Sequence, residues 1–137
     1  MTTRVLIDTG ALLAIANPRD QYHGRAVDRS RGFLATGGRW VGTALVLGEL
    51  HGHLLHRRGP GLARMVVAQL MADPAFEWRD VPLGLIQAAI DAWLVRYGDQ
   101  PFSLTDAVSF ELMRREKLTT AFAFDQDFVT AGYELLR

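Results

Sequence analysis

The chain has 137 residues, a length typical of one compact domain, and 49% of them are hydrophobic, so we expect a single domain over residues 1–137 with one proper core. Its 15 basic residues equal its 15 acidic ones, so any contact with nucleic acid must depend on local basic patches. The chain contains no cysteine, which excludes disulfides, thiol nucleophiles and thiolate metal sites. Because it also shows no signal-peptide pattern and no apolar run of about 18 residues, we expect a cytoplasmic protein without a membrane partner.

The first half of the chain alternates short apolar strands with helical patterns. Arg4–Ile7 predicts a buried strand, and residues 11–16 predict a helix that a proline ends. Residues 20–36 predict a second, more polar helix, which stops at two glycines. Residues 40–42 predict another strand, and Thr43 can cap the amphipathic helix that follows it.

The second half continues the same alternation after a Gly-Pro-Gly break. In chain order it predicts a helix over 62–71, a strand over 76–81, helices over 82–97 and 103–117, a strand over 119–124 and a short edge strand over 133–136. Short apolar strands that alternate with helices are typical of a parallel sheet with helices on both faces. The sequence therefore predicts the α/β class.

Two aspartates follow predicted strands of this sheet. Asp8 ends the first strand, Asp125 ends the strand over 119–124, and Asp127 comes two residues later. Ligands of open α/β sheets bind beyond the carboxyl ends of the strands, and a carboxylate beside a buried strand is costly to desolvate without partners. The alternative is an ordinary helix cap or loop carboxylate.

Two further acidic residues lie within predicted helices. Glu49 flanks an apolar stripe, about one turn from His53, and could equally be a solvated charge at the helix edge. Asp106 lies three residues after Ser103, in a pattern that resembles a capping box. Capping and metal binding are compatible, because a carboxylate has two oxygens.

As a set, the four carboxylates favour a metal site. At a separation of about 5 Å, each like-charged pair would cost about 3 kcal/mol at an effective dielectric constant of 20. Such a cluster stays ionised only beside a cation, and Mg²⁺ or Mn²⁺ suits a site made entirely of oxygen ligands. Divalent ions of this kind activate water and stabilise the leaving group of a phosphodiester.

Four short motifs give the chain a resemblance to the PIN-domain family, which covers Leu6 to Phe128. They are Ile7-Asp8-Thr9, Thr43 with Glu49, Leu104-Thr105-Asp106-Ala107, and Phe124-Asp125-Gln126-Asp127-Phe128. The resemblance implies a three-layer α/β/α sandwich with a mostly parallel central sheet. It also implies a Mg²⁺- or Mn²⁺-dependent endoribonuclease that cleaves single-stranded RNA, with 5′-phosphate and 3′-hydroxyl products.

The family pattern assigns roles to individual residues. The catalytic and metal-binding quartet would be Asp8, Glu49, Asp106 and Asp125, with Asp127 as an accessory acid and Thr9 and Thr105 as polar neighbours of these ligands. Gly10 departs from the pattern, because many members carry Ser or Asn there. Members of this size resemble VapC toxins, which implies a cognate antitoxin as partner, an RNA substrate and a homodimer.

Basic, histidine and tryptophan residues offer weaker indications. Arg57, Arg58 and Arg64 surround the Gly-Pro-Gly break and are our candidates for RNA phosphate contacts. Two other basic groups are Arg25, Arg29 and Arg31, and Arg114, Arg115 and Lys117, the last of which suits the negative end of a helix dipole. His51, His53 and His56 lack the spacing of a zinc motif, so we read them as a partly exposed helix face. We expect Trp40, Trp78 and Trp93 to pack in the core or an interface.

Two other functions remain open from the sequence. One is a catalytically silent PIN-like module that binds RNA or a partner, which would be marked by a broken acidic quartet. The other is a different metal-dependent phosphohydrolase on a similar sheet, which a substrate panel would separate. The RNA target and the antitoxin are not encoded in any motif of this chain.

Overall fold

The fold is taken from a computed structural model, which describes residues 2–137. These residues form one sheet whose strands are β1 (Arg4–Ile7), β2 (Arg39–Thr43), β3 (Phe76–Arg79), β4 (Thr120–Phe122) and β5 (Glu134–Leu135). The helices are α1 (Thr9–Ala16), α2 (His23–Ala35), α3 (Ala44–Arg58), α4 (Pro60–Ala72), α5 (Leu83–Ala89), α6 (Leu104–Glu116) and α7 (Asp127–Thr130), with a π-helix over Ile90–Val95.

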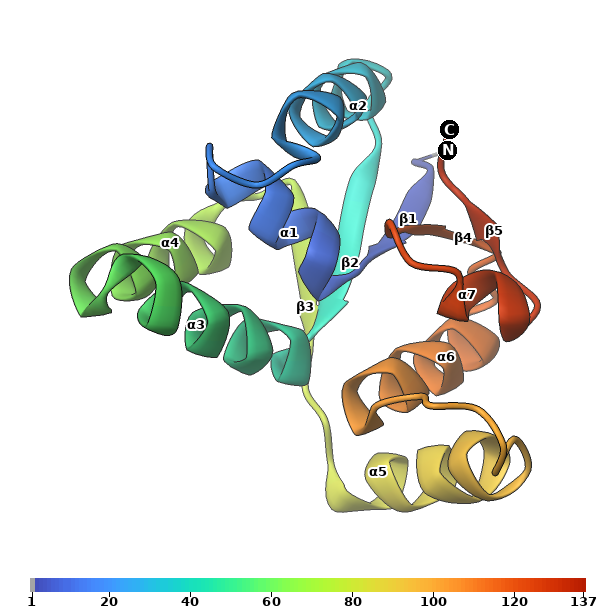
Figure 1. The fold of residues 1–137 in the computed structure, drawn as a ribbon. Coiled ribbons are helices and arrows are strands. Elements are labelled where there is room, and N and C mark those ends of the chain that lie inside the picture. The colour runs from blue at the N-terminus through green and yellow to red at the C-terminus, as the bar shows by residue number, and fades with distance from the viewer. Residues whose placement is uncertain (1) are drawn as a thin grey trace.

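The sheet has the strand order β3-β2-β1-β4-β5, and every adjacent pair is parallel. We expected a mostly parallel sheet, and it is parallel throughout. The first strand lies at its centre, with β2 and β4 on either side (Figure 1). Because the chain leaves β1 toward β2 and later returns to β4, the carboxyl end of β1 lies where the direction of winding changes, the usual position of a ligand site in such sheets.

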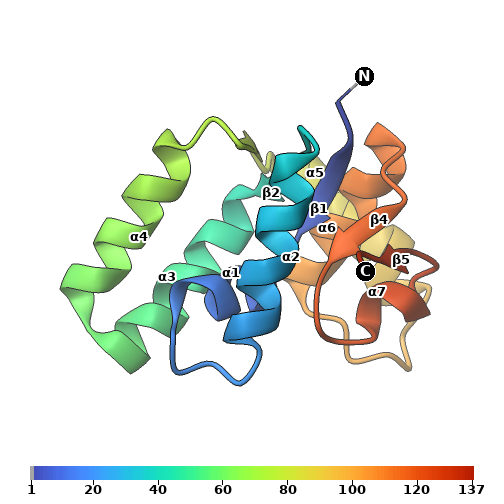
Figure 2. The same ribbon diagram turned by 90° about the horizontal axis from the view of Figure 1, so that it is seen from above.

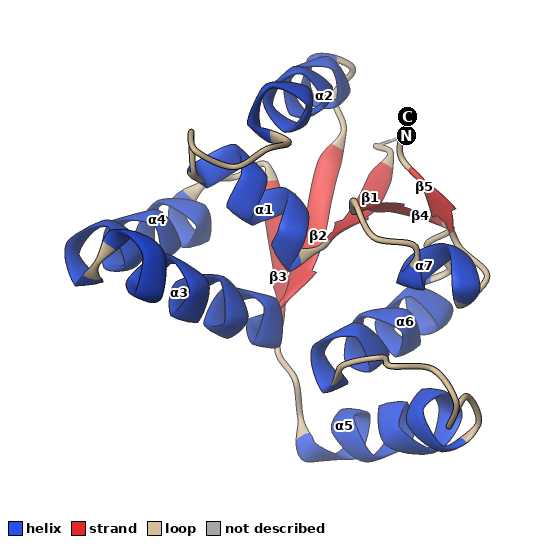
Figure 3. Cartoon of the chain, in the orientation of Figure 1, coloured by secondary structure: helices blue, strands red, loops and turns tan. Residues whose placement is uncertain are grey.

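Alternate residues of the strands build two separate cores. Val5 and Ile7 of β1 pack with α1–α4, whereas Leu6 packs with α5, the π-helix, α6 and α7. On β2, Trp40 packs in the same core as Val5 and Ile7, whereas Val41 packs in the same core as Leu6. This period of two gives helical layers on both sides of the sheet (Figure 3), so the predicted three-layer α/β/α sandwich is confirmed.

The helical hairpin of α3 and α4 extends to one side of the sheet (Figure 2). Thr43 begins it as predicted, since its Oγ1 accepts a hydrogen bond of 3.3 Å from the N–H of Val46. Gly59 joins the two helices with a φ of 90°, a conformation that favours glycine, and Pro60 begins α4. The pair holds Glu49 on a rigid element close to the sheet.

Several predicted boundaries were wrong. The helix expected over 82–97 becomes a π-helix at Ile90, and this wider turn carries Trp93, whose Nε1 donates a hydrogen bond to Glu111. The polar helix begins at His23, because the Asp20 carboxylate accepts a hydrogen bond from the N–H of Tyr22 and forms a turn first. The strand expected over 119–124 ends at Phe122, where its ladder with β1 ends.

Glu111 is a buried carboxylate on α6 that accepts hydrogen bonds from three side chains. It accepts hydrogen bonds from Arg114 and Arg115, at 2.6–3.0 Å, and from Trp93 at 3.3 Å. The Arg114 guanidinium, aided by Arg115 and Trp93 against the effect of burial, lowers the pKa of Glu111. The basic residues near this helix end thus neutralise a buried acid as well as facing the helix dipole.

We therefore expect Glu111→Gln to lower the free energy of unfolding by about 1–2 kcal/mol at pH 7, because charged hydrogen bonds become neutral ones. A lowered pKa means that the carboxylate stabilises the fold above its unfolded pKa and loses this effect as the pH falls through its folded pKa. Urea denaturation should therefore show a gap between wild type and variant that closes on acidification. The exposed Glu134→Gln variant serves as control; an equal effect there would contradict the role of the three partners.

Among residues 2–137, no helix combines the length and the apolar composition that a membrane crossing requires.

Candidate active site

Asp8 lies at the centre of the candidate site, at the carboxyl end of β1. Its N–H donates to the carbonyl of Phe122 on β4, and its carbonyl accepts from the N–H of Leu12 in α1, both at 3.1 Å. The backbone is extended there, with φ −92° and ψ 160°, and the side chain makes no capping hydrogen bond to α1. Asp8 is therefore only 4% exposed at the sheet edge, and its carboxylate does not cap α1.

Asp106 reaches the same edge from the start of α6. Its N–H donates to Ser103 Oγ at 3.0 Å, and its Oδ2 accepts from the N–H of Ser103 at 3.3 Å. The predicted capping box is confirmed. Burial raises the pKa of Asp106 to about 6, against the opposing hydrogen bonds of Ser103 and with the help of the Asp125 and Asp127 charges.

Asp125 lies in the loop after β4, three residues beyond the strand end and not directly after it as predicted. Its Oδ1 accepts a hydrogen bond of 3.0 Å from the N–H of Asp127, which fixes the loop. Burial raises the pKa of Asp125, the Asp127 hydrogen bond opposes this, and the charges of Asp127 and Glu49 raise it further. Glu49 itself is half-buried on α3.

The four predicted acids are brought together around Asp8. Burial raises the pKa of the Asp8 carboxyl to about 8, and the charges of Asp106, Asp125 and Glu49 add to the rise, while the N–H of Thr9 opposes it. These residues come from β1, α6, the loop after β4 and α3, so only the folded sheet makes them neighbours. The arrangement is an acidic cluster of oxygen ligands without a basic side chain among its members.

The residues of the cluster fit a hard divalent cation. Thr9 Oγ1, next to Asp8, is buried with no hydrogen-bond partner in residues 2–137, and carboxylate and hydroxyl oxygens are the ligands that Mg²⁺ and Mn²⁺ prefer. No three His, Cys, Asp or Glu side chains of residues 2–137 already stand in a metal-ligating arrangement.

Gly10, where the sequence departs from the family pattern, lies beside the cluster. A Cβ at this position would lie 3.9 Å from Asp8 Oδ2, an ordinary van der Waals distance. Thr105 is half-buried next to Asp106. A Cβ at residue 10 would therefore fit beside Asp8 without a clash.

The three arginines predicted to contact RNA differ in position. Arg57 lines a cavity of about 380 Å³ together with Asp125. Arg58 donates a hydrogen bond of 3.0 Å to the Asn17 side chain, and Arg64 lies exposed on α4. Only Arg57 among them borders a cavity that also contains one of the four acids.

The structure reveals two basic residues that the sequence analysis left without a role. Arg25 and Arg29 line a cavity of about 410 Å³ next to the one that contains Asp125. Their spacing of four residues on one predicted helix, which puts both on one face, was the available signal. The histidines remain a helix surface, with His53 and His56 exposed and His51 half-buried.

The tryptophans pack as predicted. Trp40 is fully buried and Trp93 is 8% exposed. Trp78 is half-buried, stacks on Phe76, and donates its indole N–H to the carbonyl of Leu70. All three tryptophans therefore pack in the core or at its edge.

The raised pKa values predict that the metal-free protein loses stability between pH 5 and pH 8. An acid with a raised pKa in the folded state stabilises the fold below its unfolded pKa and loses this effect as the pH rises through its folded value, here about 6 for Asp106 and about 8 for Asp8. Each bound proton contributes up to about 1.4 kcal/mol per pH unit. Thermal melts in EDTA should show a falling Tm over this range, and the fall should be smaller for Asp8→Asn. Equal slopes for both proteins would contradict it.

Comparison with known proteins gives a family match over nearly the whole chain. The model of the PIN domain matches residues 5–132. The 23S rRNA-specific endonuclease VapC20 of Mycobacterium tuberculosis is 32% identical over 133 residues, which are 97% of this chain and 98% of that protein.

Solved structures give the same result for the fold. The crystal structure of M. tuberculosis VapC20, described as a sarcin–ricin loop cleaving toxin, has a TM-score of 0.83 and 30% identity, over 94% of this chain and 95% of its own. VapBC2 from Rickettsia felis, bound to a DNA fragment from its promoter, has a TM-score of 0.68 at 12% identity over 97% of each chain. FitAcB from Neisseria gonorrhoeae has a TM-score of 0.65 at 17% identity, over 97% and 96%. The last two establish similarity of fold alone.

Proposed function

We propose that this chain, which belongs to the PIN domain family, is a Mg²⁺- or Mn²⁺-dependent endoribonuclease that cleaves single-stranded regions of RNA as the toxin of a toxin–antitoxin pair. The observation that carries the proposal is the convergence of Asp8, Glu49, Asp106 and Asp125 at one sheet edge. The endonuclease name of a relative that is 32% identical over 97% of the chain supports the reaction class.

The acidic residues would have different roles according to their positions. Asp8 is the most buried and would be the anchoring ligand of the cation, with Asp106, Asp125 and Glu49 around it and Asp127 as an accessory acid. When bound, the metal supplies an activated water and charge stabilisation for the leaving oxygen of the phosphodiester. The hydrogen bonds of Ser103 and of the Asp127 N–H hold Asp106 and Asp125 in place.

The proposed partners follow from the relatives and from the surface. VapC20 is named as a 23S rRNA-specific endonuclease, so 23S rRNA is our first candidate substrate, and the cytoplasm is our proposed compartment. A cognate antitoxin would cover apolar surface; an open cavity of about 380 Å³ between α1 and α4, which includes Leu62, Met65 and Val66, offers such a surface. A homodimer is part of the same proposal.

The test is cleavage of labelled single-stranded RNA and of 23S rRNA by antitoxin-free protein. We expect cleavage with Mg²⁺ or Mn²⁺, none in EDTA, and little cleavage of single-stranded DNA of the same sequence. Preferential cleavage of DNA or of a phosphomonoester would replace the proposal with another metal-dependent phosphohydrolase. Absence of Mg²⁺ or Mn²⁺ binding by calorimetry would overturn the catalytic proposal and leave a PIN-like binding module.

A further inference from the structure

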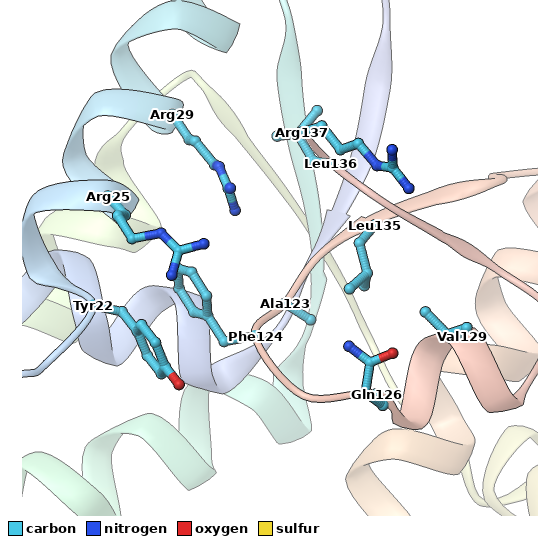
Figure 4. Close-up of a pocket in the computed structure, with 10 residues that line it drawn as sticks. All are labelled: Tyr22, Arg25, Arg29, Ala123, Phe124, Gln126, Val129, Leu135, Leu136 and Arg137. Carbon is cyan, nitrogen blue, oxygen red and sulfur yellow. The ribbon is translucent and has the colours of Figure 1, made fainter.

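A second cavity lies beside the candidate active site, between α2 and the C-terminal end of the chain. Its volume is about 410 Å³, and we call it the α2 groove; the residues that define it are Tyr22, Arg25, Arg29, Phe124, Gln126 and Arg137. Figure 4 shows Arg25 and Arg29 extending from α2 on one side, and Gln126 with Val129 on the other. None of the residues that line it is acidic.

The arginines of the α2 groove have uncompensated charges. In the part of the chain described by the structure, neither Arg25, Arg29 nor Arg137 forms a salt bridge, whereas Arg4, Arg39, Arg79, Arg114 and Arg115 all pair with carboxylates. Asp28, the acid on the same helix, does not line the groove. Three guanidinium groups without acidic partners around one cavity give a local site for anions despite the neutral overall charge.

An aromatic stack fixes one end of the α2 groove. The Tyr22 and Phe124 rings lie parallel, with centroids 4.5 Å apart and an angle of 9° between them, and Arg25 Cζ lies 5.7 Å from the Tyr22 centroid. The stack limits the freedom of the Arg25 side chain without neutralising its charge. A guanidinium positioned in this way can donate two parallel hydrogen bonds to a phosphate.

The α2 groove adjoins a cavity that contains one residue of the acidic cluster. The cavity that contains Asp125 and Arg57 shares Tyr22 and Phe124 with the α2 groove, so the two meet along the aromatic stack. At the other end, a third cavity shares Arg29 and Arg137 with it. Arginines therefore line three neighbouring cavities, with Arg57 beside Asp125 and Asp20, and Arg25, Arg29 and Arg137 farther along.

We propose that the α2 groove binds the sugar–phosphate backbone of the single-stranded RNA substrate on one side of the scissile bond, with Arg25, Arg29 and Arg137 contacting phosphates. This inference rests on the proposed ribonuclease function. RNA is favoured over an acidic protein segment because the α2 groove shares Tyr22 and Phe124 with the cavity that contains Asp125, so a strand bound in the groove would lie next to the acidic cluster. A polyanion with regularly spaced charges matches a row of cations that is open at both ends.

The test compares variants that remove equal charge from different places. R25Q/R29Q removes two charges from the groove, R31Q/R96Q removes two exposed charges outside every cavity named here, and R25K/R29K keeps the charge. Binding of a fluorescein-labelled single-stranded RNA is measured by anisotropy in EDTA over a range of NaCl concentrations. Far-ultraviolet circular dichroism and thermal melts check the fold of each variant.

We expect R25Q/R29Q to weaken RNA binding at least about tenfold and to lower the slope of log K against log salt by about 1.4, or about 0.7 per phosphate contact. The R31Q/R96Q control should keep the wild-type slope, and R25K/R29K should keep most of it. In Mg²⁺, R25Q/R29Q should raise KM for RNA cleavage with little change in kcat, because the groove lies outside the acidic cluster.

Other results would overturn the inference in separate ways. Wild-type affinity and salt slope in R25Q/R29Q, with cleavage intact, would reject the groove and leave the ribonuclease proposal standing. Loss of binding to a polyglutamate peptide, with RNA binding unchanged, would assign the groove to an acidic protein partner instead. Failure of wild-type protein both to bind and to cleave RNA would reject the groove together with the proposed function.

Discussion

Asp8→Asn should reduce RNA cleavage by about 10³-fold, the largest effect of any single substitution in this protein. Asp8 is the most buried of the acidic residues, and the other three raise its pKa, so it faces them all. Asparagine has nearly the same shape but supplies one neutral oxygen in place of a carboxylate, which removes the charge that would hold a divalent cation. Initial rates of RNA cleavage with saturating Mg²⁺ measure the loss.

The same assay can separate the roles of the acids. Asp127→Asn should cost about tenfold or less, because its backbone N–H, which holds Asp125, is kept. Asp28→Asn, on the exposed surface of α2, is the matched control and should leave the rate unchanged. The fold of Asp8→Asn is checked by its melting temperature in EDTA at pH above 8, where the wild-type carboxyl is ionised; the variant's value should equal or exceed that of the wild type, since a repelling charge is removed. A rate for Asp8→Asn within threefold of the wild type would reject the quartet as the active site.

Trp40→Ala should lower the free energy of unfolding by about 3–5 kcal/mol, the largest expected loss of stability. Trp40 is fully buried on β2, next to Val5 of β1 in the parallel ladder. Its ring packs against Phe33 of α2 at 4.3 Å and Phe122 of β4 at 5.2 Å between centroids, so it joins α2 to β2 and β4. Truncation leaves a cavity that this rigid sheet cannot close. Urea denaturation monitored by circular dichroism measures the change.

Trp40→Phe is the control for this prediction. The indole Nε1 of Trp40 is buried without a hydrogen-bond partner in residues 2–137, so its removal forfeits no bond. The variant should therefore lose less than about 2 kcal/mol, mainly through the smaller ring. A loss as large as that of Trp40→Ala would mean that the indole N–H, and not the packed volume, stabilises this position.

The sequence specified most of the fold because its signals are local. The Thr43 cap and the Ser103–Asp106 capping box depend on residues within a few positions of one another, and each occurs as predicted. The apolar strands also form, but those predicted over 76–81 and 119–124 end earlier. The unbroken apolar run Val5-Leu6-Ile7 of β1 also required two buried faces. The strand ends and the π-helix could not be predicted from local sequence. The strand ends depend on where the neighbouring strand stops, and the π-helix depends on the contact between Trp93 and Glu111.

The candidate site likewise depends partly on local sequence and partly on tertiary structure. The sequence alone singled out Asp8, Glu49, Asp106 and Asp125 as candidates, because each acid stands in a short motif that resembles those of the family. Only the tertiary structure decided that these acids lie together at one edge, that Arg57 lines a cavity with Asp125, and that Arg25 and Arg29 line the neighbouring cavity. The stack of Tyr22 on Phe124 at one end of the α2 groove joins segments about a hundred residues apart. No local pattern encodes that contact, since it arises from the order in which β1, β4 and β5 pair and from the helix that packs across them.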